Sequence, residues 1–324
     1  MDPFGEQPAT TATITALAGS SLKAAGPIKP RYHQIDGMRM PMGFPPEGLA
    51  SGMAYIPSGN DIFVVSYPKS GTTWLQYIVY LLIRRRPLGH DETLVDHFPH
   101  LEEVGARAIE AVPQRRLIKT HLPCGMAPFS SSATYLIIAR NPFDCAVSFF
   151  HHTRGFPRHY DFSEGTFAEF LDCFIDGEVD FGDYFDHLAS WYSESSQDNV
   201  LFLTYECLQH DPGSVIRGIA SLLGPIASSS IAAEGDLERL IQETSLSSMQ
   251  QDQQRWSSAR PDWAPAFVRK GKVGDWRSVF TPSQTRALLA KFDRRMTGAG
   301  MANLWPDLIA EARRYAGAGS PGFE

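Results

Sequence analysis

The chain has 324 residues, of which 43% are hydrophobic and 20% are charged, and this composition is typical of a globular protein. Its formal net charge is −7 and its Lys and Arg residues are scattered, so nucleic-acid binding has little support. An acidic chain that binds a polyanion has to concentrate its positive charge locally.

The cysteines and the N-terminus indicate the compartment. The four cysteines are far apart and form no Cys-x-x-Cys pair, so neither a disulfide framework nor a metal site is expected. No apolar run approaches the length of a membrane span, and the N-terminus lacks the basic region of a signal peptide. These features predict a cytoplasmic protein that is not inserted in a membrane.

Two parts of the chain differ in composition. Residues 1–28 are rich in Ala, Thr, Gly and Ser, and we interpret them as a flexible tail. Motifs run nearly end to end through the remainder, which predicts a single domain over residues 29–324. Within it, the prolines and glycines from Pro41 to Pro57 predict an ordered loop that leads into the first strand.

Short apolar runs alternate with amphipathic segments. Their near-continuous hydrophobicity is typical of strands that are covered on both faces, and predicts buried strands at 62–66, 116–120, 135–139 and 200–204. Helical spacing predicts helices at 74–82, 144–153, 166–176, 184–197 and 212–223. The alternation predicts an α/β fold with a central parallel sheet flanked by helices. Ligands of such sheets bind beyond the carboxyl ends of the strands.

The segment Tyr67–Trp74 joins the first expected strand to its helix. Gly71 allows the backbone to approach a ligand closely, and Lys69 adds a positive charge. Three hydroxyl groups lie beside the free amides of the helix N-terminus, those of Ser70, Thr72 and Thr73. A plain strand-to-helix turn is the alternative, but a lysine inside the turn favours a phosphate-binding loop.

This loop is not a Walker A motif. Lys69 comes two residues before the only glycine of the loop, whereas the Walker lysine directly follows a second glycine. The strand expected at 135–139 ends in Arg140 and not in the aspartate that would hold magnesium. Basic side chains therefore have to neutralise the ligand, which argues against a nucleoside triphosphate and against a metal.

The strand expected at 116–120 delivers Lys119 and His121 at its carboxyl end. The two side chains lie two residues apart, so on an extended chain they point the same way. A lone histidine is more often structural than catalytic. Beside a lysine at the ligand-binding edge, however, a neutral imidazole suits a general base, because nearby positive charge helps to keep it unprotonated.

Two further basic clusters are expected at the same edge. Arg140 follows the third strand and Ser148 lies in the next helix, so both can contact one anion, while an ion pair of Arg140 with Asp144 is the alternative. Residues 268–276 hold three cations and two glycines, which suits a loop that closes over a phosphate. A solvated loop is the alternative there.

Together these segments resemble the cytosolic sulfotransferase family of small-molecule enzymes. The matching motifs are Tyr-Pro-Lys-Ser-Gly-Thr-Thr-Trp at 67–74, Lys-Thr-His-Leu-Pro at 119–123, Ala-Arg-Asn-Pro at 139–142 with Ser148, Tyr-Glu at 205–206 with Asp-Pro at 211–212, and Arg-Lys-Gly with Gly-Asp-Trp at 269–276. The resemblance covers about residues 32–296. It implies in-line transfer of a sulfuryl group from 3'-phosphoadenosine 5'-phosphosulfate (PAPS) to a phenol, alcohol or amine, with the bisphosphate PAP as product and no metal.

The resemblance also implies a role for each matching residue. The 5'-phosphosulfate is expected to contact Lys69, Ser70, Gly71, Thr72 and Thr73. The 3'-phosphate is expected to contact Arg140, Ser148, Arg269, Lys270 and Gly271. The adenine is expected to lie among Trp74, Tyr205, Thr244, Ser245 and Leu246. The implied catalytic residues are Lys69, Lys119 and His121, with His121 taking the proton of the acceptor.

The chain departs from the family pattern at two places. The family often has an aromatic residue after the Thr-Ser pair, where this chain has Leu246, which packs on a base without ring stacking. The family's dimer motif, Lys-x-x-x-Thr-Val-x-x-x-Glu, is poorly kept, and its places are taken by Arg277, Thr281, Pro282 and Arg286. These substitutions argue against the usual homodimer and leave a monomer or another interface open.

The acceptor pocket is expected in the segment that lines the acceptor site of this family, at His151, His152, Phe156 and His159. His152 stands where an apolar aromatic residue is common, which favours a more polar acceptor. Three further candidates lie upstream, Phe98, His100 and Leu101.

Three functions compete for this pattern. An active sulfotransferase fits every cluster. A nucleotide kinase or other NTPase shares the sheet and the loop, but it needs a Walker lysine and a magnesium ligand. A catalytically silent binding protein keeps the fold for another use, and the retained Lys69, Lys119 and His121 argue against it.

Overall fold

The computed structural model describes residues 26–256 and 261–318. At its centre is a four-stranded parallel sheet with the strand order β4-β3-β5-β6, formed by β3 (Ile62–Val65), β4 (Leu117–Thr120), β5 (Thr134–Ala139) and β6 (Val200–Thr204). The prediction of an α/β fold with a central parallel sheet is confirmed. Each strand agrees with its expected bounds to within one residue.

The register of the sheet brings the strand ends to one edge. Val65 at the end of β3 lies opposite Thr120 of β4 and Ile137 of β5, and Ala139 of β5 lies opposite Thr204 of β6. The residues that follow the strands therefore meet at this edge. They are the loop 67–71, His121, Arg140 and Tyr205.

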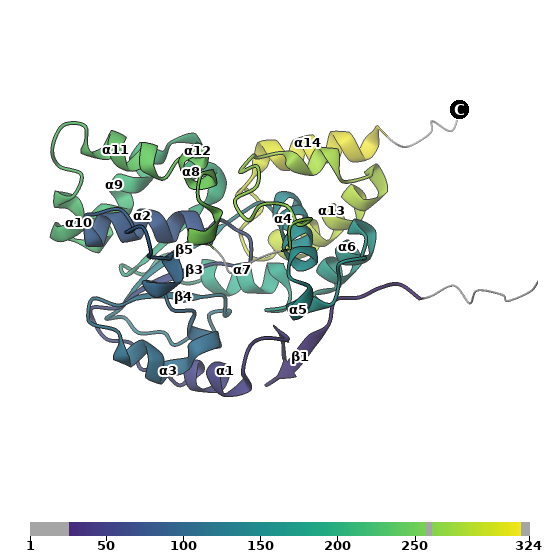
Figure 1. The fold of residues 1–324 in the computed structure, drawn as a ribbon. Helices are drawn as coiled ribbons and strands as arrows, with labels where there is room; N and C mark the ends of the chain where they lie inside the picture. The colour runs from purple at the N-terminus through teal and green to yellow at the C-terminus, as the bar shows by residue number, and fades with distance from the viewer. Residues whose placement is uncertain (1–25, 257–260, 319–324) are drawn as a thin grey trace, which may run out of the picture.

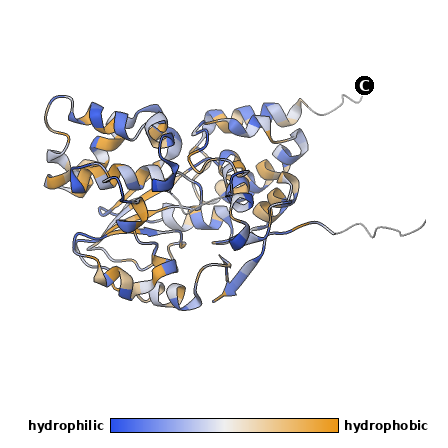
Figure 2. Ribbon diagram, viewed as in Figure 1, coloured by the Kyte–Doolittle hydropathy of each residue, from blue (hydrophilic) through white to orange (hydrophobic). Residues whose placement is uncertain are grey.

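Helices cover both faces of the sheet because the strands are apolar on both sides (Figures 1 and 2). Ile62 and Val64 of β3 pack in one cluster with α2 (Thr72–Arg84) and α9 (Pro212–Leu223). The alternate residues Phe63 and Val65 pack in another cluster with α3 (Leu101–Ala111) and α7 (Tyr184–Tyr192). All four of these β3 side chains are at most 1% exposed, as a central strand requires.

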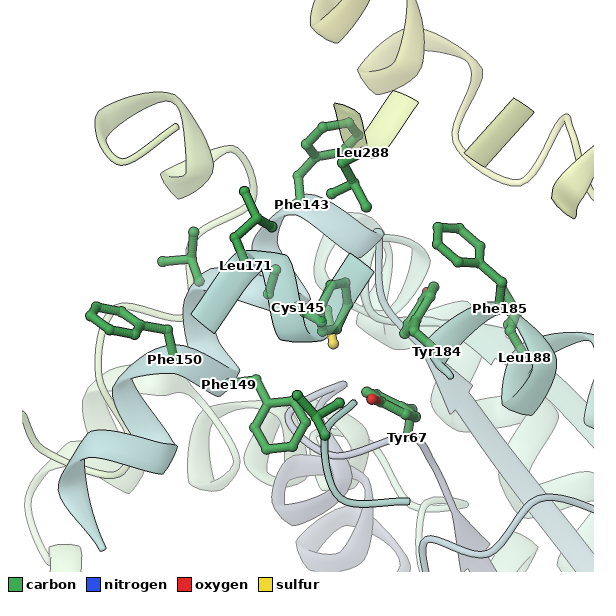
Figure 3. Close-up of a cluster of buried hydrophobic side chains, with 14 of the residues drawn as sticks. Tyr67, Phe143, Cys145, Phe149, Phe150, Leu171, Tyr184, Phe185, Leu188 and Leu288 are labelled. Atoms are coloured by element: carbon green, nitrogen blue, oxygen red, sulfur yellow. The ribbon is translucent and has the colours of Figure 1, made fainter. Parts of the chain in front are cut away.

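A third cluster lies beside the sheet, on the right in Figure 1, and anchors the phosphate-type loop. Besides part of α7, it contains side chains from α4 (Pro142–Gly155), α6 (Phe167–Asp176), α13 (Pro282–Met296) and α14 (Pro306–Gly317). Tyr67, at the start of the loop, points into this aromatic cluster beside Phe149 and Tyr184 (Figure 3), with ring centroids 5.8 and 5.2 Å away. Its hydroxyl donates to the carbonyl oxygen of Gly182 at 2.9 Å. The loop is thus fixed at its base.

The remaining elements are short. The antiparallel strands β1 (Tyr32–Ile35) and β2 (Met38–Pro41) pair with each other. The other helices are α1 (Pro46–Met53), α5 (Pro157–Tyr160), α8 (Tyr205–His210), α10 (Pro225–Ser229), α11 (Asp236–Glu243) and α12 (Leu246–Gln250). Three 3-10 helices complete the fold, η1 (Leu94–Asp96), η2 (Gln253–Arg255) and η3 (Asp275–Ser278).

Two expectations about secondary structure are wrong. The loop expected from Pro41 to Pro57 contains the helix α1, because its glycines serve close packing and not turns. A Cβ atom at Gly48 would lie 2.5 Å from the carbonyl oxygen of Glu103 in α3. The helix expected at 184–197 ends at Tyr192. The expected helices at 144–153, 166–176 and 212–223 are present as α4, α6 and α9.

The predictions about the termini and the dimer stay open. Residues 1–25 of the expected tail lie outside the described residues, whereas the backbone N–H of Ile28 donates to Glu169 at 2.8 Å. The residues at the places of the dimer motif make contacts within the chain, since Arg277 pairs with Glu311 and Arg286 donates to the carbonyl of Ala316. Across the described ranges, no helix is long and apolar enough to cross a membrane.

Candidate active site

A cavity of about 520 Å³ lies where the strand ends meet, within the size range of small-molecule sites. It is lined by most of the residues that the sequence predicts for a donor, Lys69, Gly71, Thr72, Thr73, Trp74, Arg140, Ser148, Tyr205, Thr244, Ser245, Leu246, Arg269, Lys270 and Gly271. Lys119 and His121 line it too, together with His152, Phe156 and His159. Ser70 and His151 are not among the lining residues.

The phosphate-type loop has an unusual backbone. Lys69 has φ +68° and Gly71 has φ +108°, and the left-handed conformation is uncommon for a residue with a side chain. A Cβ atom at Gly71 would lie 2.7 Å from the ring of Tyr205, so only glycine fits there. The buried hydroxyl of Ser70 faces the thiol of Cys145 at 3.8 Å and not the cavity. The hydroxyl of Thr72 lies 2.5 Å from that of Ser66.

The side chain of Lys69 contacts an aromatic ring of the cavity lining. Its Nζ atom lies 3.9 Å from the ring centroid of Phe267, which is a cation–π contact. Sequence reasoning missed Phe267, although it stands directly before the basic segment 268–276. The ring places an apolar wall opposite the loop.

Arg140 is held by an aromatic face and a carbonyl group. Its guanidinium lies 4.4 Å from the ring centroid of Tyr205, and its Nη2 atom donates to the carbonyl oxygen of Lys272 at 3.2 Å. The alternative of an Arg140–Asp144 ion pair is wrong. Asp144 instead accepts from the backbone N–H groups of Gly274 and Trp276, at 2.7 and 3.0 Å.

The basic segment 268–276 is folded against the cavity. Arg269 and Lys270 both donate to Asp275, each at 2.7 Å. The hydroxyl of Tyr205 donates to the carbonyl oxygen of Gly271 at 2.8 Å. Two guanidinium groups and one ammonium group therefore gather on this side, which can hold a doubly charged anion.

The expected adenine side is built from Trp74, Tyr205 and the start of α12. The rings of Trp74 and Tyr205 meet edge to face with centroids 5.4 Å apart. Thr244 is buried and donates to the carbonyl of Leu240 in α11, while Ser245 caps α12 by accepting from the N–H of Ser248. Leu246 is 39% exposed and supplies an apolar contact.

His121 is clamped from two sides. Its Nδ1 atom lies 2.7 Å from the carbonyl oxygen of Ser66, and its backbone N–H donates to the carboxylate of Glu102 at 2.5 Å. Because a carbonyl oxygen only accepts, the proton of the neutral ring resides on Nδ1 and the lone pair on Nε2. Burial, together with the charges of Lys119 and His100, holds the pKa of His121 well below its usual value. The imidazole is therefore neutral at neutral pH.

Lys119 lines the same part of the cavity. Burial lowers the pKa of its ammonium group, and the carboxylates of Glu102 and Glu103 act in the opposite direction. The two side chains that the sequence places on one side of the strand end, Lys119 and His121, are thus brought together.

The far end of the cavity is rich in aromatic and imidazole rings. His152 and Phe156 lie with ring centroids 4.7 Å apart, and His159 packs over Gly43, where a Cβ atom would lie 2.4 Å from the ring. His100 lines the cavity as well, whereas Phe98 and Leu101 belong to the buried core. Lining residues that sequence reasoning missed include Phe44, Glu103, Tyr160, Asp180 and Phe181.

His151 lies elsewhere. Burial lowers the pKa of its imidazole to about 4, and the nearby positive charge of Arg269 acts in the same direction. The structure thus brings His151 close to the basic segment and not to the far end of the cavity.

These features define an α/β protein with a cavity at the carboxyl edge of its sheet, where basic side chains and a helix N-terminus suit an anionic ligand and a neutral imidazole lies beside them. Within the described ranges, no group of three or more His, Cys, Asp or Glu side chains is arranged to hold a metal ion. The chain belongs to the sulfotransferase family, because residues 59–300 match the family described as the sulfotransferase domain.

Known proteins agree with this membership. The chain is 30% identical to sulfotransferase 1C2 of Oryctolagus cuniculus over 258 residues, which are 75% of this chain and 85% of that protein. It is 32% identical to sulfotransferase 2B1 of Mus musculus over 291 residues, 82% of this chain and 81% of that protein. The crystal structure of mouse sulfotransferase SULT7A1 complexed with PAP aligns with a TM-score of 0.68 and 29% identity, covering 89% of this chain and 99% of that one.

Proposed function

We propose that this chain transfers a sulfuryl group from PAPS to a small acceptor, with His121 as the general base. The observation that carries the proposal is the 2.7 Å contact of His121 Nδ1 with the carbonyl oxygen of Ser66, which leaves Nε2 as a proton acceptor inside a basic cavity. The relative SULT7A1, whose fold this chain shares, is described in complex with PAP.

The chain's own residues fit a donor with anionic groups at two ends. Lys69 and the N-terminus of α2 form one basic group in the cavity lining, and Arg140, Arg269 and Lys270 form a second group. Gly71 has no side chain, so the backbone of the loop packs directly against the ring of Tyr205. We therefore expect the 5'-phosphosulfate at the first group and the 3'-phosphate at the second.

The reaction needs a base for the acceptor and positive charge for the leaving group. Bound PAPS supplies the sulfuryl group and its phosphate leaving group. His121 accepts the acceptor's proton on Nε2 as the acceptor atom bonds to sulfur, and the carbonyl oxygen of Ser66 then stabilises the imidazolium through Nδ1–H. Lys69 and Lys119, which line the cavity, stabilise the negative charge that develops.

A transfer assay tests the proposal. Sulfur-labelled PAPS is incubated with the protein and a neutral phenol without metal, and the labelled sulfate ester is separated by chromatography. A parallel reaction uses ATP labelled in its terminal phosphate, with magnesium. We expect sulfuryl transfer and no phosphoryl transfer. Phosphoryl transfer without sulfuryl transfer would indicate a nucleotide kinase instead. Binding of PAPS without transfer of either group would indicate a catalytically silent binding protein.

A further inference from the structure

One buried carboxylate among the described residues forms no ion pair, and one of its oxygen atoms accepts no hydrogen bond. Within the described residues, five acidic side chains are buried, Asp61, Glu102, Asp144, Asp180 and Asp275. Four of them have a cation, an imidazole or two backbone amides within reach. The side-chain hydrogen bond that Asp180 accepts comes from the hydroxyl of Tyr160 at 2.9 Å, and the Oδ1 atom of Asp180 has no hydrogen-bond partner among the described residues.

Asp180 is a lining residue of the active-site cavity although it is only 1% exposed. The next residue, Phe181, has φ +62°, a strained conformation for a bulky side chain, and such conformations cluster at functional sites. The ring of Phe181 lies 5.2 Å from the ring of His121, centroid to centroid. Asp180 and His121 therefore line the same cavity, and the residue next to Asp180 contacts the ring of His121.

The surroundings of Asp180 suit a cation. Burial raises the pKa of its carboxyl group to about 7, although the hydrogen bond from Tyr160 acts in the opposite direction. No cation of residues 26–256 and 261–318 forms an ion pair with it. Asp183, three residues on, has such a partner in Lys291. Aromatic rings line the same end of the cavity, those of Phe44, Phe156, Tyr160 and Phe181, and ring faces attract ammonium groups.

We propose that Asp180 selects the acceptor, and that this acceptor is a small hydroxyaryl amine whose protonated amine pairs with Asp180 while its hydroxyl group faces His121. A neutral acceptor can donate a hydrogen bond to the Oδ1 atom of Asp180, but it supplies no positive charge to balance the carboxylate. An ammonium group supplies both the hydrogen bond and the missing positive charge. This assignment rests on the proposed sulfuryl transfer.

Three phenols of similar size test the proposal: tyramine, 4-propylphenol and 3-(4-hydroxyphenyl)propanoate, which are cationic, neutral and anionic at pH 7.4. The kcat/KM of sulfation is measured for each with wild-type protein. We expect tyramine to exceed 4-propylphenol by roughly 10- to 100-fold, the usual worth of a charged hydrogen bond, and the anion to be the poorest. A wild-type protein without preference for tyramine over 4-propylphenol would overturn the proposal.

Three substitutions test which carboxylate causes the preference for tyramine. Asp180→Asn is expected to lower the tyramine-to-propylphenol ratio toward one. Asp198→Asn, at an exposed position, is the matched control and is expected to keep it. Glu103 is the exposed carboxylate among the lining residues, so a ratio lost in Glu103→Gln and kept in Asp180→Asn would overturn the assignment.

The thermal shift caused by PAP, measured for every variant, distinguishes failure of the proposed function from failure of the Asp180 assignment. If PAP does not stabilise the wild-type protein and no phenol is sulfated, the proposed function fails. If PAP stabilises it and 4-propylphenol is sulfated as well as tyramine, only the assignment of Asp180 fails.

Discussion

The Nδ1 atom of His121 lies 2.7 Å from the backbone carbonyl oxygen of Ser66, the residue that directly follows β3. The contact ties the end of β4 to the start of the phosphate-type loop. It also fixes the tautomer of the imidazole, so that Nε2 carries the lone pair. The position of the base and that of the donor loop are therefore coupled through one hydrogen bond.

Replacing His121 by Ala is expected to lower kcat roughly 10²- to 10⁴-fold, because a general base contributes about that much. The affinity for PAP, measured by calorimetry, is expected to change little, since the imidazole faces the acceptor. His90→Ala is the control, because the His90 side chain is 96% exposed and lies outside the cavity. A His121→Ala protein with most of its turnover would remove this residue from the mechanism.

The pH dependence of kcat follows from the lowered pKa of His121. Burial disfavours the imidazolium, so the neutral, active form persists below the usual histidine pKa of about 6.5. We expect kcat to be flat from about pH 6.5 to 8 and to fall only in more acidic buffer. A rate that rises steeply between pH 7 and 8 would show a different base. The same shift acts on folding: stability from His121 is present above pH 6.5 and is lost as the pH falls, because the unfolded chain then binds the proton.

Asp180 acts in the opposite direction on stability. Its carboxyl pKa is raised from 3.8 to about 7 in the folded protein, so the folded state prefers the protonated form. Stability is therefore lost as the pH rises from about 4 through 7, by up to about 4 kcal/mol. Asp180→Asn lacks this dependence. Urea unfolding of both proteins at several pH values is expected to show the variant gaining on the wild type as the pH rises, and a constant difference would contradict the shift.

The sheet, and the gathering of basic residues at its carboxyl edge, could be predicted from the sequence because their signals are local. Apolar β-branched runs marked the four strands, and the basic and glycine residues after them stand in fixed motifs, so the parallel register brought Lys69, His121, Arg140 and Tyr205 to one edge. The acceptor end could not be predicted. Asp180 lies in an irregular turn, and only the three-dimensional structure shows that it lines the cavity without an ion pair to a cation of the described residues.

The glycines of the sequence indicate turns correctly in one place and wrongly in another. In α1, Gly48 lets two helices pack closely, which a sequence pattern cannot distinguish from a turn. At Gly71 the same residue type marks a true backbone requirement, with φ +108°. The sequence pattern predicted three histidines for the acceptor pocket. His152 and His159 line the cavity, whereas His151 does not.

Gly71→Ala is expected to destabilise the protein by about 1–3 kcal/mol and to weaken PAP binding, because the new methyl group meets the ring of Tyr205 in a strained backbone conformation. Gly218→Ala is the matched control. Gly218 lies within α9 with no atom in the way of a methyl group, so this change is expected to stabilise the protein by about 0.5–1 kcal/mol. Thermal unfolding with and without PAP measures both. Equal effects of the two substitutions would contradict the role of the loop.

The most direct test of the central claim is a thermal-unfolding titration with PAP in the absence of metal, compared with ATP and magnesium. A ligand at a hundredfold excess over its dissociation constant stabilises the folded state by about 2.7 kcal/mol. We expect PAP alone to produce a shift of this size, through Lys69, Arg140 and the basic segment 268–276. Stabilisation by ATP with magnesium and none by PAP would contradict a PAPS-dependent sulfotransferase.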